Sequence, residues 1–386
     1  MKAFTLGCAA LAAGCMIISA GAAPVAVRAE EELAPACKSA YLVDYDTGTA
    51  VYSKNEEERL PIASMCKIMT LLLSFEAADR GELSYDELIR VSENASGMGG
   101  SQVYLETNLE YPVEQLLKSI AVCSANDSCV AMAERVAGSE TLFIERMNAR
   151  AKELGAENTL FANCTGLPKE TQYSCAKDVS LMLRELLKHK KYYEFSRVWL
   201  EDFAHPDGRV TEMTNTNKLV RFYNGCDGGK TGFTNEAGFC LAATAKRGEM
   251  RLVSVVIGSE SSKARFGAVS TLFDYGFANY ETKTLLEAGK ELEEKVSVRG
   301  SRITELGVVP SKTLTAFGKK GEAGEYTISI ELKPDLKAPV AVGDEVGSAT
   351  LFLSGVEIGH TELLANGDAP KFSWWDAYRE SAQNWN

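Results

Sequence analysis

Apolar and polar residues alternate in short stretches near both ends of the segment 40–280. Residues 40–52 form two such stretches around an Asp46-Thr47-Gly48 turn, and residues 239–245 and 251–257 form two more around Arg247-Gly248-Glu249. Strand side chains have a period of two, and short glycine-containing loops join antiparallel neighbours. The pattern therefore predicts two hairpins that join in one antiparallel sheet.

Between these hairpins, apolar positions recur at the three-to-four-residue spacing of an α-helix. A long helix is predicted from Ser64 to Asp79, just before Gly81. Further helices are predicted at residues 113–123, 127–136, 142–154, 176–189 and 263–280. Helices packed on an antiparallel sheet give an α+β fold or a three-layer arrangement.

The pattern changes after about residue 286. Short β-like stretches at residues 296–298, 326–332 and 349–353 alternate there with Gly, Pro and Asp. We therefore predict a small all-β domain over residues 286–370, after a larger domain over residues 30–285. A chain of 386 residues is long enough for both.

Residues 1–29 have the pattern of a secretory signal peptide. After a basic start, residues 3–27 carry no charge, and small residues suggest cleavage near Ala22 or after Ala29. An uncleaved membrane anchor and a lipoprotein cleavage site at Cys15 are the alternatives. The weak hydrophobicity of Ala and Gly counts against the anchor, and the apolar run beyond Cys15 counts against lipidation. All three interpretations place the remaining chain in an extracytoplasmic location.

The net charge and the positions of the histidines argue against several classes of function. The chain has 41 Lys and Arg against 53 Asp and Glu, a formal net charge of −12, which argues against nucleic acid as a partner. The histidines His189, His205 and His360 fall in separate predicted segments. They indicate no Ser-His-Asp set and no metal cluster, and we expect no cofactor.

The predicted helix at Ser64 holds the most informative local feature. From Pro61 to Phe75 the only charged residue is Lys67, and a helix this apolar around its circumference is buried. Burial disfavours the charged form of an amine, and Ser64 lies three residues earlier on the same face. The pair can act as general base and nucleophile. The alternative is a serine that caps the helix and a lysine that extends to water.

Two more motifs lie further along the chain. Ser124 and Asn126 fall between two predicted helices, where their side chains can face a cleft; alone they would be an ordinary capping turn. Lys230-Thr231-Gly232 follows two glycines and precedes a predicted strand, and its alternative interpretation is a flexible turn. Glycines here allow another backbone to approach closely. The three motifs in this order are far more specific than any one of them.

Ser-x-x-Lys, Ser-x-Asn and Lys-Thr-Gly are the motifs shared by penicillin-binding proteins and serine β-lactamases. The chain resembles the low-molecular-mass penicillin-binding proteins of the peptidase S11 family, which are serine-type D-alanyl-D-alanine carboxypeptidases. The similarity covers nearly all of the chain after the leader. Residues that carry it include Pro61-Ile62-Ala63-Ser64, Ser96-Gly97-Met98-Gly99-Gly100-Ser101, Ser124-Ala125-Asn126-Asp127, Asn163-Cys164-Thr165-Gly166-Leu167, Asn215-Thr216-Asn217-Lys218-Leu219, Gly228-Gly229-Lys230-Thr231-Gly232-Phe233-Thr234, and, in the β domain, Pro339-Val340-Ala341-Val342-Gly343-Asp344 and Gly355-Val356-Glu357-Ile358-Gly359.

This resemblance implies a β-lactamase/transpeptidase-like catalytic domain and a role for each motif residue. Ser64 would be the acylated nucleophile, Lys67 its base, and Ser124 a proton relay to the leaving amine. Lys230 would keep Lys67 neutral by like-charge repulsion. The implied substrate-binding residues hold the peptide amide, complete the oxyanion hole with the N–H of Ser64, or bind the terminal carboxylate: Asn126, Lys230, Thr231, Gly232, Phe233 and Arg265. For Arg265, an exposed helix arginine is the alternative.

The resemblance implies removal of the last D-alanine from a peptidoglycan pentapeptide through an acyl-serine intermediate. β-Lactam antibiotics would acylate the same serine and act as inhibitors. A serine β-lactamase and a non-catalytic scaffold that binds penicillin or peptidoglycan are the alternatives. A lactamase needs an activated deacylating water, and the extra β domain argues against it. The intact Ser64, Lys67 and Lys230 argue against the scaffold.

The cysteines depart from the family pattern, and the role of the C-terminal tail stays open. Of ten cysteines, eight lie between Cys37 and Cys240, and Cys66 stands where relatives usually have Thr. Cys66 and Cys123 adjoin the catalytic motifs, so we expect mostly free thiols that pack as small apolar groups. The tail at residues 371–386 holds three of the four tryptophans. Membrane contact and packing against the β domain are both consistent with such a tail.

Overall fold

The computed structural model describes residues 32–322, 325–375 and 378. The predicted signal peptide at residues 1–29 and Trp385 lie outside these residues. The predicted antiparallel sheet is present, with the strand order β2-β1-β9-β8-β7. Its strands are β1 Ser39–Asp44, β2 Ala50–Lys54, β7 Cys226–Thr234, β8 Gly238–Arg247 and β9 Met250–Ser259. The sheet joins both ends of the segment because β1 pairs with β9.

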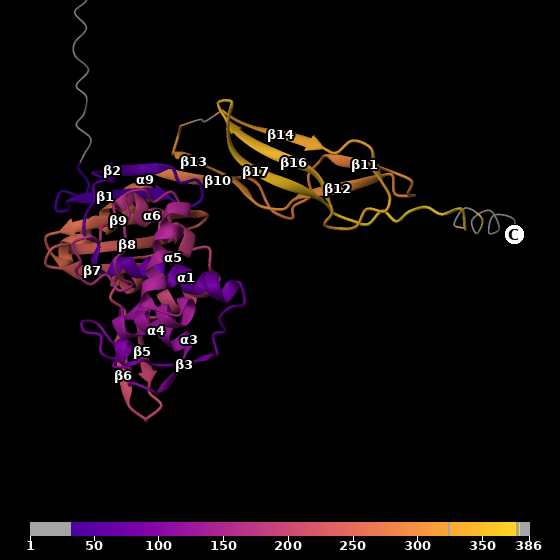
Figure 1. Ribbon diagram of the computed structural model, residues 1–386. Helices are drawn as coiled ribbons and strands as arrows, with labels where there is room; N and C mark the ends of the chain where they lie inside the picture. Colours follow the sequence, from indigo (N-terminus) through magenta and orange to yellow (C-terminus); the bar gives the residue numbers. More distant parts are fainter. Residues whose placement is uncertain (1–31, 323–324, 376–377, 379–386) are drawn as a thin grey trace, which may run out of the picture. The chain divides into compact units, whose positions relative to one another are not determined.

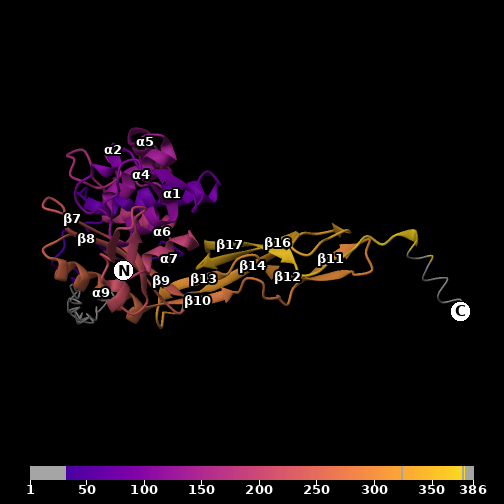
Figure 2. The same cartoon turned by 90° about the horizontal axis from the view of Figure 1, so that it is seen from below.

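Alternating residues of β9 pack on opposite faces of the sheet. Val253 and Val255 belong to the larger core, together with buried residues of the central helices, whereas Leu252 and Val256 pack in a second core with the last helix. These helices are α1 Lys67–Asp79, α3 Val113–Val122, α4 Asn126–Ala137, α5 Glu140–Glu153, α6 Ala176–Leu186 and α9 Ser262–Asn279. Figures 1 and 2 show them around the sheet. The α+β prediction with helices on the sheet is confirmed.

Several short elements have no clear signature in the sequence. They are the helices α2 Glu93–Ser96, α7 Lys190–Ser196 and α8 Leu219–Phe222, and the two hairpins β3 Leu88–Arg90 with β4 Glu110–Pro112 and β5 Leu200–Ala204 with β6 Val210–Thr214. Three to seven residues are too few for a periodic pattern to stand out.

Lys230-Thr231-Gly232 was expected to precede a strand, and a flexible turn was the alternative interpretation. These residues instead lie inside a strand, β7, and pair with Ala242, Leu241 and Cys240 of β8. Because β8 lies on one side of β7 only, β7 is an edge strand of the five-stranded sheet. Its glycines and its lysine hide the usual alternation of apolar residues.

The described chain beyond α9 forms a β structure, as predicted. A six-stranded sheet has the order β14-β16-β17-β12-β11-β15, and β10 pairs with β13. The strands are β10 Tyr280–Leu286, β11 Lys295–Arg299, β12 Glu305–Pro310, β13 Leu314–Lys319, β14 Tyr326–Leu332, β15 Leu336–Lys337, β16 Glu345–Leu353 and β17 Val356–Ala365. Within the described stretches 280–322 and 325–370 no helix forms. β10 begins before residue 286, the start expected for this domain.

Candidate active site

Ser64 and Lys67 lie together where the first long helix begins. Residues Ala63–Cys66 form one 3-10 turn that continues into α1, so both side chains fall on the same side of the chain. Lys67 is fully buried, and its Nζ lies 3.0 Å from the Ser64 Oγ and 2.5 Å from the Thr165 carbonyl oxygen. The amine is therefore held against the serine hydroxyl by the loop at Thr165.

Close backbone contacts fix the turn that carries Ser64. Ala63 has a φ of +47°, a strained conformation for a residue with a side chain. On one side, a Cβ on Gly166 would lie 2.0 Å from the Ala63 oxygen, and on the other, a Cβ on Gly232 would lie 2.6 Å from the Ile62 oxygen. Only glycine fits at either position. The turn is thus clamped between the loop at Gly166 and strand β7.

Ser124 and Lys230 form a second hydroxyl–amine pair. Ser124 has a φ of +69°, and the Lys230 Nζ donates to its Oγ at 2.8 Å and to the Thr231 carbonyl at 3.2 Å. Lys230 is 1% exposed, and burial lowers its pKa well below the ordinary value, with a further contribution from the positive charge of Lys67. In the described part of the chain neither amine forms an ion pair with a carboxylate. Two positive charges are therefore disfavoured here.

Asn126 presents an unused acceptor. Its Nδ2 donates to the Gly99 carbonyl at 2.7 Å, which fixes the amide, and its side chain is 3% exposed. Its Oδ1 has no hydrogen-bond partner within the described residues. A buried acceptor of this kind is costly unless a ligand N–H satisfies it.

Arg265 is a buried cation, not the exposed helix residue of the alternative interpretation. It is 8% exposed, and its Nη1 donates to the Gly232 and Cys240 carbonyls at 3.0 and 3.3 Å. The rings of Phe239 and Phe266 lie within 5.5 and 4.8 Å of the guanidinium. Burial lowers its pKa to about 10, and its Nε has no partner among the described groups. The charge thus lacks an anionic partner beside β7.

The cysteines near these motifs are buried groups. Cys66 is fully buried and donates to the Asn163 carbonyl, and burial raises the pKa of its thiol. Burial raises the pKa of Cys123 to about 11. The eight cysteines of the described chain are unpaired. In the same residues, no group of three His, Cys, Asp or Glu side chains could hold a metal ion.

The loop at residues 163–167 is part of the site, although no role for it was predicted from the sequence. The Asn163 Oδ1 accepts from the backbone N–H groups of Thr165 and Gly166, at 3.1 and 2.6 Å, and so shapes the loop that positions Lys67. The only sequence feature that could have indicated this role is the resemblance of one stretch to the family, namely Asn163-Cys164-Thr165-Gly166-Leu167. Its contact with Ala63 is invisible in the sequence because the two are about 100 residues apart.

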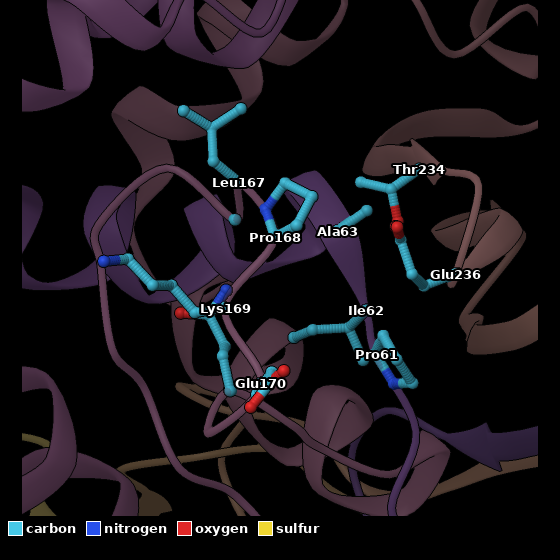
Figure 3. A pocket seen from close by; sticks show the side chains of 11 residues that line it. Pro61, Ile62, Ala63, Leu167, Pro168, Lys169, Glu170, Thr234 and Glu236 are labelled. Carbon is cyan, nitrogen blue, oxygen red and sulfur yellow. The ribbon is translucent and has the colours of Figure 1, made fainter.

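A cavity of about 340 Å³ opens beside Ala63, the residue before Ser64 (Figure 3). Its lining comes from the Ser64 turn, from the loop after Gly166 and from the end of β7: Pro61, Ile62, Ala63, Gly166, Leu167, Pro168, Lys169, Glu170, Gln172, Thr234 and Glu236. Contacts with β7 thus connect the Ser64 turn at Gly232, the Ser124 hydroxyl at Lys230 and Arg265 at Gly232, and the cavity is lined by Thr234 at the end of the same strand.

Comparison with known proteins agrees with this arrangement. Residues 25–261 match the D-alanyl-D-alanine carboxypeptidase family, peptidase S11, and residues 280–371 match the C-terminal domain of penicillin-binding protein 5. The D-alanyl-D-alanine carboxypeptidase DacF of Bacillus subtilis is 39% identical over 355 residues, which cover 92% of this chain and 91% of that protein.

Two solved structures are also similar. Penicillin-binding protein 5 from Haemophilus influenzae has a TM-score of 0.67 and 29% identity, over 87% of this chain and 98% of that one. Penicillin-binding protein D2 from Listeria monocytogenes, in its ampicillin-bound form, has a TM-score of 0.56 and 31% identity, over 63% and 98%. The chain belongs to the peptidase S11 family of D-alanyl-D-alanine carboxypeptidases and carries the C-terminal domain of penicillin-binding protein 5.

Proposed function

We propose that this protein removes the terminal D-alanine from peptidoglycan pentapeptides through an acyl intermediate on Ser64, and that β-lactams acylate the same serine. The observation that carries the proposal is the 3.0 Å contact between the Ser64 Oγ and the Nζ of the buried Lys67, beside a second such pair. Family membership supports the reaction class.

In the first step, the Ser64 Oγ attacks the carbonyl carbon of the penultimate D-alanine. The serine proton passes to the neutral amine of Lys67, and negative charge develops on the carbonyl oxygen. The backbone N–H groups of Ser64 and Phe233 are proposed to bind this oxygen. The two come close together because the Ser64 turn packs against Gly232, the residue before Phe233: a Cβ built on Gly232 would lie 3.1 Å from the Ser64 nitrogen. The peptide C–N bond then breaks, and the departing D-alanine nitrogen takes a proton through Ser124.

The two lysines support proton transfer as a coupled pair. They share a buried site without a carboxylate, so a proton on one amine disfavours a proton on the other. Burial and the positive charge of Lys67 lower the pKa of Lys230, and the family pattern assigns the neutral form to Lys67. We therefore assign one shared positive charge to the pair while the hydroxyl of Ser64 is intact.

In the second step, water attacks the acyl carbon of the Ser64 ester. The amine pair accepts a proton from the water, the ester C–O bond breaks, and Ser64 recovers its proton. The products are the shortened peptide and free D-alanine, so atoms and charges balance. No redox step is involved.

The remaining groups orient the peptide. The free Oδ1 of Asn126 is proposed to accept from a substrate amide N–H. Arg265, with Thr231 and Lys230, is proposed to bind the terminal carboxylate, since a desolvated cation without an anionic partner favours such a ligand. A free C-terminal carboxylate is what distinguishes a carboxypeptidase substrate from an internal peptide bond.

An extracytoplasmic location is part of the proposal, because peptidoglycan lies outside the cytoplasm and residues 1–29 read as a signal peptide. No helix in the described residues is long and apolar enough to cross a membrane. Trp374 and Trp375 are exposed, and their rings stack at 3.8 Å. These exposed rings favour peripheral membrane contact for Trp374 and Trp375, while Phe372, at the start of the tail, contacts Gly300 and Arg302 of the β domain.

The test uses the chain from residue 30 onward and a Ser64→Ala variant. Each is incubated with a peptide that ends in D-Ala-D-Ala and with labelled penicillin. Release of D-alanine and stable labelling, both lost in Ser64→Ala, are expected. Rapid penicillin turnover without D-alanine release would support a β-lactamase instead, and neither signal would support a non-catalytic scaffold.

A further inference from the structure

We infer that Tyr192 is a positioning residue for the reaction: its buried hydroxyl holds the β7 backbone at Gly229, and this keeps the amine of Lys230 in place. The inference rests on the proposed function, because it concerns the same two hydroxyl–amine pairs. It goes beyond that function because Tyr192 lies outside the three motifs. Among the described residues, it forms no hydrogen bond with Ser64 or Ser124.

The hydroxyl of Tyr192 satisfies both backbone groups of one residue on the edge strand. Tyr192 lies in α7 and is 1% exposed, and its Oη donates to the Gly229 carbonyl at 3.3 Å and accepts from the Gly229 N–H at 3.1 Å. β7 has β8 on one side only, so buried backbone groups on its other side need partners. A hydroxyl can donate and accept at once. Tyr192 therefore takes the place of a neighbouring strand at Gly229.

Ser196 and Asn217 close the same edge of β7 just before that point. They donate to the carbonyls of Asp227 and Gly228, at 2.7 and 3.1 Å respectively. A Cβ on Gly228 would lie 3.0 Å from the Ser196 Oγ, so only a glycine lets α7 pack this closely on the strand. Tyr192 holds the last residue of this closed stretch.

Gly228, Lys230 and Gly232 lie on one face of β7, because side-chain directions alternate along a strand. This face meets α7 at Gly228, and two residues later the Lys230 amine reaches the Ser124 hydroxyl at 2.8 Å. Another two residues on, Gly232 packs against the Ser64 turn. The position of the strand beside α7 therefore sets where the lysine amine lies.

Removal of the hydroxyl would leave two buried polar groups at Gly229 without partners. Gly229 has a φ of +129° and no side chain, so its peptide can rotate to recover a partner. Lys230 is the next residue and would move with it, away from the position in which its amine repels a proton on Lys67. A weaker repulsion lets both lysines stay protonated to a higher pH. A protonated Lys67 cannot act as the base.

The test measures the rate of acylation by labelled penicillin against pH, for the chain from residue 30 onward and for its Tyr192→Phe variant. On the acid side, the rate should rise with pH as the lysine pair loses its second proton. We expect the maximal rate of Tyr192→Phe to be roughly 10-fold to 100-fold lower, the size of effect that a shift of about 1 Å can cause. The pH of half-maximal rate should rise by about half a unit, the change that about 1 Å brings to two charges about 4 Å apart.

The other titratable groups around the two lysines stay the same in both proteins. They are Cys66, Cys123, Cys129 and Arg265. Tyr192 itself is uncharged at these pH values, since burial raises its pKa. A shift of the half-maximal pH therefore reports the distance between the lysines.

Two control variants separate positioning from a general loss of stability. Tyr111→Phe removes another buried hydroxyl, which accepts from the Glu106 N–H at 3.3 Å. Ser196→Ala frees the Asp227 carbonyl, two residues before Gly229. Both variants should unfold at a lower temperature than the wild-type protein, but neither should change the half-maximal pH. Loss of stability reduces the amount of folded protein and leaves the lysine pair unchanged.

Three results would overturn the inference: an unchanged half-maximal pH in Tyr192→Phe, an equal shift in either control, or a Tyr192→Phe protein that does not fold. In each case a structural role would account for the hydroxyl. D-alanine release and penicillin labelling by the wild-type protein would still support the proposed function. Absence of both signals from the wild-type protein overturns the proposed function instead.

Discussion

Replacement of Gly166 by alanine tests whether the clamp on the Ser64 turn sets catalytic geometry. The new Cβ would lie 2.0 Å from the Ala63 oxygen, 2.5 Å from its carbonyl carbon and 2.9 Å from Ser64 N. Real Cβ contacts essentially never fall below 3.0 Å, so the backbone before Ser64 must move. The required shift of about 1 Å is of the size that can reduce a rate about 100-fold.

A second cost of this substitution is conformational. Gly166 has a φ of +82°, and an alanine in the left-handed region costs about 1–2 kcal/mol. Gly155→Ala separates the two effects, because Gly155 has a φ of +76° and no atom within 4 Å of its added Cβ. Both variants should lose stability, but only Gly166→Ala should lose acylation.

The assay is the rate of acylation by labelled penicillin, measured beside thermal unfolding of each variant. We expect Gly155→Ala to be acylated at the wild-type rate and Gly166→Ala to be about 100-fold slower. Wild-type acylation by Gly166→Ala, at a temperature where it stays folded, would refute the proposed role of the clamp.

Three further predictions concern charge and thiols. Asp227→Asn should destabilise the protein by about 3–5 kcal/mol in denaturant unfolding, because Asp227 accepts two hydrogen bonds from the buried Arg251, at 2.7 and 2.8 Å; a loss below 1 kcal/mol would contradict this. Lys230→Met should abolish D-alanine release yet raise stability. The pKa of Lys230 is lowered in the folded state, so the unfolded state binds more protons between that pKa and 10.5. The free energy of unfolding of the wild-type protein should therefore rise with pH in this range, and its difference from that of Lys230→Met should shrink. A difference that grows with pH would contradict this prediction. The chain from residue 30 onward, denatured under non-reducing conditions, should titrate as eight free thiols. A titration that finds no free thiol would overturn the expectation of free cysteines.

Much of the fold could be predicted because its hydrophobic patterns are long. The hairpin at residues 40–52, the helix to Asp79 and the strands on either side of Gly248 are all present in the structure. β7 was not predicted as a strand because Gly228, Gly229 and Lys230 break the alternation that marks a strand. The lysine is buried there for the site rather than for the sheet.

Some residues of the candidate site could likewise be predicted from the sequence, and others could not. The motif residues Ser64, Lys67, Ser124 and Lys230 could be picked from spacing and from resemblance, since side chains three residues apart share a helix face. The contributions of Thr165 and Gly166 could not, because they depend on backbone atoms that meet only in the folded chain. The cavity beside Ala63 combines three distant segments and has no local pattern at all.

The central claim is that Ser64 is the residue acylated by substrate and by β-lactams. Mass spectrometry of peptides from the penicillin-treated protein tests it most directly, with Ser64→Ala and Cys123→Ala variants alongside, because the Cys123 thiol directly precedes Ser124 in the chain. We predict an adduct on the peptide that contains Ser64 in the wild-type protein and in Cys123→Ala, and none in Ser64→Ala. An adduct that persists in Ser64→Ala, or one that maps to Cys123, would contradict the account.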